Sequence, residues 1–331
     1  MKIKSGLMPN IESSKCLVIG GAGFIGSHVV EELIKEDVSE IVVYDNFCRG
    51  TYDNLKIALK DPRVSIYDIG GDITQTDILN SAMKGKDYVI HLAALWLLQC
   101  YEYPRAAFDV NIQGTFNVLE ACVRNNIKKL IYSSSASVYG DAVELPMSEE
   151  HPYNNRTFYG ATKIAGEQMC RAYHDRYGLD YAGLRYMNVY GTRQDYKGAY
   201  VAVIMKILDR IDQGLSPIVY GDGSQAYDFV YVSDVARSNI CALKADETDT
   251  FYNVGRGTKT TIKELCEMIL KITGSDLDIQ YESAGQTFVT NRIGSTEKAE
   301  MEIGFTAQIE LEEGLRNLIE WRKEAIKRSN K

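Results

Sequence analysis

Short apolar segments alternate with longer amphipathic segments along the first half of the chain. Residues 16–20 form an apolar run that ends in glycine, as a buried parallel strand often does. The following segment, residues 27–35, has the pattern of a helix. The alternation recurs and predicts further strands over residues 40–44, 63–67, 87–91, 129–132 and 180–184, and further helices over residues 104–125 and 158–177. This order predicts an α/β fold with a Rossmann-type doubly wound parallel sheet.

The alternation loosens in the second half. The pattern there predicts helices over residues 199–213, 234–244, 261–273 and 310–327 and strands over residues 218–220 and 228–232, with Ser233 as the N-cap of the helix over 234–244. Such a mixture is typical of a smaller α/β lobe beside the sheet. We expect one domain over residues 1–187, to which residues 229–252 return, and a C-terminal lobe over residues 188–331.

Composition and charge limit the kinds of partner and the compartment that we expect. The chain has 331 residues and a net charge of -8, which argues against nucleic acid as its main partner. Its seven cysteines are scattered and include no C-x-x-C pair, so reduced thiols in the cytoplasm are expected, and neither a disulfide framework nor a metal site. The apolar run over residues 93–98 is too short to span a membrane, and residues 1–14 lack the apolar core of a signal peptide.

A glycine triplet follows the first predicted strand. Gly20, Gly23 and Gly26 have G-x-x-G-x-x-G spacing, and residues 27–35 continue as a helix. Gly20 permits a tight turn, Gly23 lets backbone approach a pyrophosphate, and Gly26 lets the helix pack on the strand. The N-terminus of this helix offers unpaired N–H groups to phosphates, and Phe24 and Ile25 before it are further expected cofactor contacts. A triplet alone could be a simple turn, but a strand before it and a helix after it favour a dinucleotide site.

Asp45 supports this interpretation. It ends the second predicted strand, about 20 residues beyond the triplet, where an acid accepts hydrogen bonds from an adenosine ribose. A carboxylate there repels a 2′-phosphate, so NAD is favoured over NADP, although Arg49 lies nearby in the chain. Further cofactor contacts are expected from residues at the ends of the predicted strands: Asn46, Asp72, Ile73, Leu92, Ala93, Ala94 and Ser133.

Tyr159 and Lys163 are four residues apart in a predicted helix, so their side chains share one face. An ammonium close to a phenol lowers the pKa of the phenol, as a tyrosine that acts as a base near neutral pH requires. Ser135, at the end of the neighbouring strand, can bring a hydroxyl to the same place. The spacing alone also fits an ordinary amphipathic helix.

Together these motifs resemble the extended short-chain dehydrogenase/reductase family, and within it the nucleoside-diphosphate-sugar epimerases of the UDP-glucose 4-epimerase type. The similarity extends from about Lys15 to Lys327, and its motifs are Gly20-x-x-Gly23-x-x-Gly26, the run over residues 133–140, Tyr159-x-x-x-Lys163 and Arg185-Tyr-Met-Asn188. The resemblance implies an enzyme that inverts C4 of a UDP-sugar through a 4-keto intermediate and recycles NAD. It implies that Ser135, Tyr159 and Lys163 are catalytic. It also implies a homodimer that pairs the helices of Asn111 and Lys163.

The resemblance also implies substrate contacts. Tyr186 would lie on the nicotinamide side, Asn188 near the substrate diphosphate, Gln225 near the nucleotide, and Arg292 would be a cation for the diphosphate. Tyr227 stands where the family usually has an arginine that grips a phosphate.

Two departures need an explanation. Tyr227 lacks the positive charge of the family's arginine, so another cation would have to bind the phosphate. Arg193 and Lys197 are candidates. Trp96 follows the fourth strand in place of more polar residues, where it either stacks on the sugar or packs against the sheet.

Three other functions are weighed against the epimerase. A 4,6-dehydratase would need carboxylates directly after Ser135, where Ala136 and Ser137 stand. A sugar-nucleotide decarboxylase would need cations for a carboxylate, which Arg185 and Arg193 could supply, but Ser137 replaces its usual glutamate. A non-catalytic NAD-sensing module would have lost at least one of the three catalytic residues, all of which are present.

Overall fold

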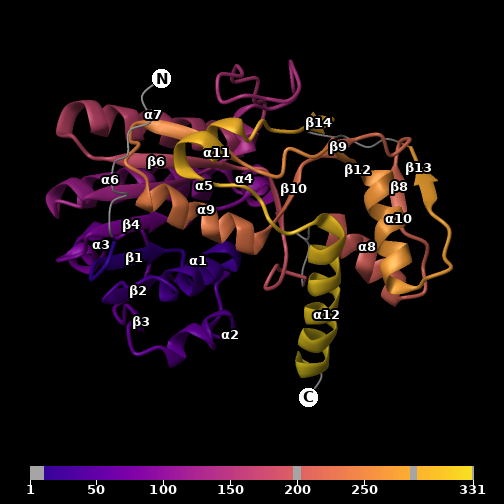
Figure 1. Cartoon of the computed structure of the whole chain (residues 1–331), viewed down its shortest axis with the longest axis horizontal. Coiled ribbons are helices and arrows are strands. Elements are labelled where there is room, and N and C mark those ends of the chain that lie inside the picture. Colours follow the sequence, from indigo (N-terminus) through magenta and orange to yellow (C-terminus); the bar gives the residue numbers. More distant parts are fainter. Residues whose placement is uncertain (1–10, 197–202, 284–288, 330–331) are drawn as a thin grey trace.

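The computed structural model describes residues 11–196, 203–283 and 289–329. Its central sheet has seven parallel strands in the order β11-β6-β5-β4-β1-β2-β3 (Figure 1). The strands are β1 (Lys15–Ile19), β2 (Glu40–Tyr44), β3 (Val64–Ile66), β4 (Tyr88–His91), β5 (Lys129–Ser135), β6 (Tyr181–Tyr186) and β11 (Thr250–Val254). The strand order reverses between β1 and β4, which confirms the predicted doubly wound sheet and places a ligand crevice at this point.

Alternate residues of each strand contact different helical layers. In β1, Leu17 and Ile19 pack in the core that includes residues of α3, α6 and α7, whereas Cys16 and Val18 pack in the core that includes residues of α1 and α9. The helices α1 and α9 lie side by side (Figure 1). These helices are α1 (Phe24–Ile34), α3 (Thr76–Met83), α6 (Thr115–Arg124), α7 (Phe158–Tyr177) and α9 (Val232–Lys244).

The helix predicted over residues 104–125 changes its winding. It consists of α5 (Pro104–Ala107), a π-helical segment η2 (Phe108–Gly114) and α6. Asn111 lies in this segment, accepts a hydrogen bond from the Leu95 amide (2.7 Å) and donates one to Thr162 Oγ1 (3.1 Å). It therefore ties the loop after β4 to α7. A short π segment has no hydrophobic period of its own, so the sequence pattern did not reveal it.

The second half of the chain adds small sheets and three helices around a further core. β7 (Asn188–Tyr190) pairs with β10 (Phe229–Tyr231), β8 (Ile218–Tyr220) pairs with β13 (Gln280–Glu282), and β9 (Ala226–Tyr227) pairs with β12 (Thr260–Thr261) and β14 (Asn291–Arg292). The helices of this core are α8 (Val203–Asp212), α10 (Ile262–Thr273) and α12 (Leu311–Ser329). The shorter helices are α2 (Tyr52–Leu55), η1 (Ala58–Lys60), α4 (Leu97–Glu102), η3 (Ala136–Val138) and α11 (Glu297–Ile303).

Two sequence predictions need correction or restriction, and one strand was not predicted. Ser233 is not an N-cap, because β10 runs directly into α9 and Tyr231 is the cap residue. The helix predicted over residues 199–213 is α8, and residues 199–202 lie outside the described residues. The seventh strand, β11, was missed because polar Thr250 and Asn253 interrupt its apolar pattern. The amide of buried Asn253 donates to the Met147 carbonyl at 2.9 Å.

Within the described residues, no helix is both long enough and apolar enough to cross a membrane. The same residues contain no cluster of histidine, cysteine and acidic side chains that could hold a metal ion. All seven cysteines carry free thiols, and most of them are buried.

Candidate functional site

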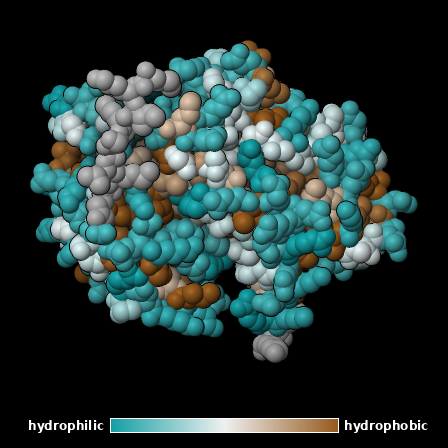
Figure 2. All heavy atoms as spheres, in the orientation of Figure 1, coloured by the Kyte–Doolittle hydropathy of each residue, from teal (hydrophilic) through white to brown (hydrophobic). Residues whose placement is uncertain are grey.

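A cleft of about 2090 Å³ opens at the carboxyl ends of the sheet strands. At one end it lies between α2 and α12, where the surface is hollowed in Figure 2. Every residue predicted to contact cofactor or substrate lines this cleft: Gly20, Gly23, Phe24, Ile25, Gly26, Asp45, Asn46, Asp72, Ile73, Leu92, Ala93, Ala94, Ser133, Ser135, Tyr159, Lys163, Tyr186, Asn188, Gln225, Tyr227 and Arg292. The fold therefore gathers residues from both halves of the chain into one site.

The glycine turn forms a cradle that side chains would fill. Gly20 has a positive φ of 79°, and a Cβ at Gly26 would lie 2.1 Å from the Gly20 carbonyl oxygen. α1 begins at Phe24, and its N-cap, Gly23, provides no side-chain hydrogen bond. The first N–H groups of the helix are thus directed at the cleft without a capping side chain. This cradle fits the diphosphate of a dinucleotide.

Asp45 is held at the end of β2 by two backbone amides. Its carboxylate accepts hydrogen bonds from the amides of Ala22 (2.9 Å) and Phe47 (2.8 Å). Burial raises the pKa of Asp45, and these amides act in the opposite direction. Its remaining lone pairs suit the hydroxyls of a ribose.

Ser135, Tyr159 and Lys163 converge in the same cleft. Thr157 caps α7 by accepting a hydrogen bond from the Gly160 amide (3.1 Å), so Tyr159 lies in the first turn. The Ser135 hydroxyl lies close enough to the Tyr159 phenol to lower the pKa of that phenol. Lys163 Nζ lies 5.9 Å from the centre of the Tyr159 ring and donates to the Ser133 carbonyl at 2.7 Å. The predicted four-residue spacing does bring these groups together.

The expected effect of Lys163 on its neighbour is wrong for this structure. Burial raises the pKa of Tyr159 to about 12, and only the hydrogen bond with Ser135 and the charge of Arg292 act against it. Burial also lowers the pKa of Lys163 to about 8. The ammonium of Lys163 is directed at the Ser133 carbonyl, so it is not the phenol's main charge partner.

Tyr186 is fixed behind these groups. Its hydroxyl shares a hydrogen bond with Ser133 Oγ (3.0 Å) and donates to Asn239 Oδ1 (3.0 Å). Burial raises the pKa of Tyr186 to about 12, so it stays protonated near neutral pH. It therefore orders the wall of the cleft on the side of Ser133.

Arg185 is buried behind the site and does not face a ligand. Its Nε and Nη2 bind the carboxylate of Glu167 at 2.9 and 2.8 Å. Its other hydrogen bonds go to the hydroxyls of Tyr139 (2.8 Å) and Tyr153 (3.2 Å) and the carbonyl of Glu149 (2.8 Å). All five donors of the guanidinium are used.

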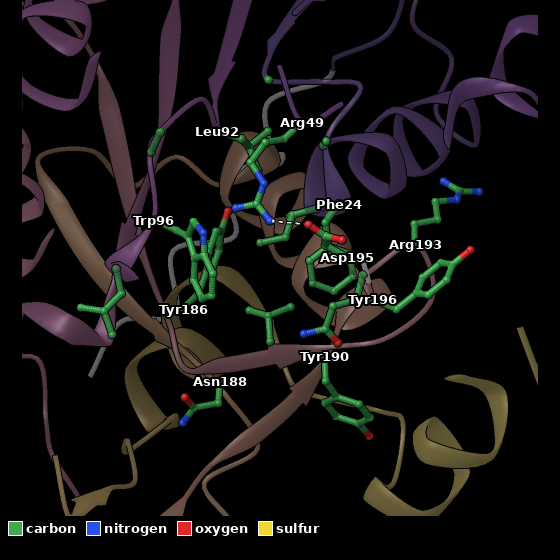
Figure 3. Close-up of a pocket in the computed structure, with 18 of the residues that line it drawn as sticks. Phe24, Arg49, Leu92, Trp96, Tyr186, Asn188, Tyr190, Arg193, Asp195 and Tyr196 are labelled. Carbon is green, nitrogen blue, oxygen red and sulfur yellow. Dashed lines mark hydrogen bonds and ion pairs between the residues drawn. The ribbon is translucent and has the colours of Figure 1, made fainter. Parts of the chain in front are cut away.

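The substitutes considered for the missing arginine are not confirmed. Arg193 forms an ion pair with Glu31, and Figure 3 shows its guanidinium directed away from Asn188. Lys197 lies outside the described residues.

Arg292 is next to Tyr227 instead. The two residues are partners in the parallel pair β14 and β9, and the Tyr227 hydroxyl donates to the Val289 carbonyl at 2.9 Å. Within the described residues, Arg292 Nε and Asn188 Nδ2 are buried donors without a hydrogen-bond acceptor. Burial lowers the pKa of Arg292, while Tyr227, Tyr159 and Asp141 favour its charge. A buried cation with a spare donor suits an anionic ligand.

The cleft also contains Trp96, for which the sequence left sugar stacking and packing open, and residues to which the sequence assigned no contact. Trp96 lines the cleft and does not serve only as packing against the sheet; the Arg49 guanidinium lies 5.4 Å from the centre of its ring. Asp195 and Phe229 line the cleft as well. The sequence indicated Arg49 only as a cation near Asp45, and no motif indicates Asp195 or Phe229.

Comparisons with known proteins agree with this geometry. The model of the NAD dependent epimerase/dehydratase family matches residues 16–255. A putative UDP-glucose 4-epimerase of Methanocaldococcus jannaschii is 36% identical over 310 residues, which cover 93% of this chain and 98% of that protein. A dTDP-glucose 4,6-dehydratase of an Actinoplanes species is 31% identical over 93% of this chain and 97% of that protein.

A solved structure is equally similar. The UDP-N-acetylglucosamine 4-epimerase of Methanobrevibacter ruminantium M1, in complex with UDP-N-acetylmuramic acid, superposes with a TM-score of 0.89 at 35% identity, covering 95% of this chain and 99% of that one. The glycine cradle, the position of Asp45 after β2 and the full-length similarity lead to one conclusion. The chain belongs to the NAD-dependent epimerase/dehydratase family of sugar-nucleotide enzymes, with NAD as its cofactor.

Proposed function

We propose that the protein is a nucleoside-diphosphate-sugar epimerase that inverts C4 of a UDP-sugar through a transient 4-keto intermediate. The observation that carries this proposal is the convergence of Ser135, Tyr159 and Lys163 in the cleft, with Ala136 and Ser137 directly after the serine. This set of groups can remove and return a proton at one sugar hydroxyl. It has no carboxylate at the place where elimination chemistry would require one.

The residues divide the chemistry between them. NAD, when bound, supplies the hydride acceptor, and its oxidised ring brings a positive charge that favours the phenolate of Tyr159. Tyr159 takes the proton of the 4-hydroxyl and later returns it to the same oxygen. Ser135 hydrogen-bonds the reacting oxygen and the phenol, and Lys163 holds the nicotinamide ribose. Inversion would require the cleft to hold the keto-sugar with either face directed at the cofactor.

Cofactor and substrate occupy successive parts of the cleft in this proposal. Asp45 and Asn46 bind the adenosine ribose, and the backbone around Gly23 binds the cofactor diphosphate. Asn188, Gln225 and Tyr227 contact the sugar nucleotide beyond the nicotinamide. The side chain of Gln225 now donates to the Tyr220 carbonyl at 3.2 Å, at the entrance that we assign to the nucleotide base. We propose a cofactor domain over residues 1–187, with residues 229–252 returning to it, and a mainly substrate-binding lobe over residues 188–331.

The other functions have less support. The cations that a decarboxylase would use, Arg185 and Arg193, are paired with Glu167 and Glu31. A dehydratase would need acids next to Ser135, and Ala136 and Ser137 are both buried, uncharged residues of η3.

A panel of sugar nucleotides tests the proposal. The purified protein is incubated with UDP-, GDP- and dTDP-hexoses, and products are followed by anion exchange and proton NMR. We expect C4 epimers of a UDP-sugar without net change in NAD. A stable 4-keto-6-deoxy product would show a dehydratase, carbon dioxide release a decarboxylase, and tight NAD binding without turnover a sensing module. Each of these outcomes would overturn the proposal.

Substitution of Arg292 tests the substrate diphosphate site. Arg292→Ala is expected to raise KM for the sugar nucleotide roughly 10- to 100-fold, because it removes charge-assisted hydrogen bonds to the diphosphate. NAD affinity should not change. Exposed Arg176, on α7, provides the matched control Arg176→Ala. Unchanged KM in the Arg292 variant would remove this residue from the site.

We also propose that the protein is a cytoplasmic homodimer. Its free thiols support the cytoplasm as the compartment, and exposed aromatic side chains on neighbouring helices support the dimer. These are Tyr101, Tyr103, Phe108, Phe116, Phe158 and Tyr177, on or beside α4, η2, α6 and α7. Light scattering is expected to give the mass of two chains, and Phe116→Glu should shift the protein towards one. A monomeric wild-type protein would contradict the dimer.

A further inference from the structure

Arg49 lies across the middle of the cleft. Its Nη2 is 3.1 Å from Asp195 Oδ2, and its guanidinium carbon is 5.4 Å from the centre of the Trp96 ring. Figure 3 shows the guanidinium between Trp96 and Asp195, close to Phe24 at the start of α1. Arg49, Trp96 and Asp195 come from the segments that follow β2, β4 and β7. Arg49 thus lies beside the cradle that fits the cofactor diphosphate.

This ion pair is easily broken. The side chains of Arg49 and Asp195 are 36% and 45% exposed. Exposed pairs of this kind contribute little to stability, since water and salt screen them. The Trp96 ring also contacts the guanidinium, but this contact holds it less firmly than a second ion pair would. Arg49 can therefore exchange Asp195 for a stronger anion without a large cost.

The cradle itself lacks a positive side chain. The turn from Gly20 to Gly26 contains no charged residue, and the first turn of α1 has none either. The backbone N–H groups and the helix dipole supply only partial charges. A diphosphate carries two negative charges, and a planar guanidinium binds phosphate oxygens through paired, charge-assisted hydrogen bonds.

We propose that Arg49 is a ligand of the cofactor diphosphate, and that Asp195 holds it beside the cradle when the cofactor is absent. On cofactor binding, the guanidinium moves from the Asp195 carboxylate to the diphosphate, while Trp96 remains beneath it. This inference rests on the family's NAD site and does not depend on which sugar is the substrate. It predicts that Arg49 and Asp195 have opposite effects on NAD affinity.

Three substitutions in the full-length protein, freed of copurified cofactor, test this exchange by calorimetry. Arg49→Gln is expected to weaken binding of NAD and of ADP-ribose about tenfold. The affinity for adenosine should stay the same, because adenosine has no diphosphate. Asp195→Asn is expected to strengthen NAD binding severalfold, because it removes the competing anion. Arg49→Lys should bind with intermediate affinity. The salt dependence of NAD binding should be smaller in Arg49→Gln than in the wild type.

Two results would overturn the proposal. Equal weakening of NAD binding by Arg49→Gln and Asp195→Asn would mean that the pair is only a structural tie across the cleft. A loss of UDP affinity with unchanged ADP-ribose affinity would assign Arg49 to the substrate diphosphate. Thermal melting of each variant confirms that these exposed substitutions leave the fold intact.

Discussion

Replacement of Tyr159 by phenylalanine is expected to lower turnover by about 10³-fold while NAD affinity stays within twofold of the wild type. The phenol is the only acid–base group that we assign to the sugar hydroxyl, and its loss leaves no proton acceptor at that oxygen. The ring itself remains, so its contacts in the cleft and its distance from Lys163 are retained. Steady-state kinetics on the substrate found in the panel, together with calorimetric NAD binding, measure both quantities.

A tyrosine on the same helix provides the control. Tyr173 donates its hydroxyl to Glu120 at 2.6 Å and does not line the cleft. Tyr173→Phe makes the same chemical change on α7 and is expected to leave turnover unchanged. Wild-type turnover in Tyr159→Phe would exclude this residue as the base and leave Ser135 as the group to test.

Loss of Glu167 is expected to destabilise the protein by about 3–5 kcal/mol. The carboxylate is fully buried, forms a bidentate ion pair with Arg185, and accepts hydrogen bonds from Ser134 (2.5 Å) and Tyr153 (2.7 Å). Glu167→Ala would leave the Arg185 guanidinium buried without its counter-ion, and an uncompensated buried charge is expensive. Chemical denaturation at equilibrium measures the change in the free energy of unfolding.

An exposed glutamate on another helix is the matched control. Glu267 lies on α10, and its side chain is 54% exposed beside Lys263 at 4.0 Å. Glu267→Ala is expected to change the free energy of unfolding by less than about 1 kcal/mol. If both alanine variants were equally stable, the buried pair would have no special part in the fold. Glu167 also connects β5, β6 and α7, so its loss should loosen the strand ends that carry Ser135 and Tyr186.

Much of the framework could be predicted from sequence because its determinants are local. The alternation of apolar runs and amphipathic segments predicted six of the seven strands of the central sheet. The glycine triplet predicted a turn that only small residues allow, and the structure confirms it at Gly20 and Gly26. Tyr159 and Lys163 could be paired because helical periodicity alone determines which residues share a face.

Other features required the packed chain. Arg185 and Arg193 are equivalent cations in sequence, yet Arg185 is paired with Glu167 of α7 and Arg193 with Glu31 of α1. Arg292 became adjacent to Tyr227 only through the pairing of β14 with β9. Burial, which no short motif encodes, reversed the expected direction of the Tyr159 pKa.

The sequence by itself determined the fold class, the cofactor cradle and the identity of the candidate base, because these depend on periodicity, backbone freedom and spacing within one element. The tertiary structure alone decided which charges face the cleft and which are neutralised behind it. Arg49 illustrates the difference: its place in the chain suggested only a cation near Asp45. Contacts with Trp96 and Asp195, made across three loops, hold it at the cleft. Such contacts join distant segments, and they form only when the whole chain is packed.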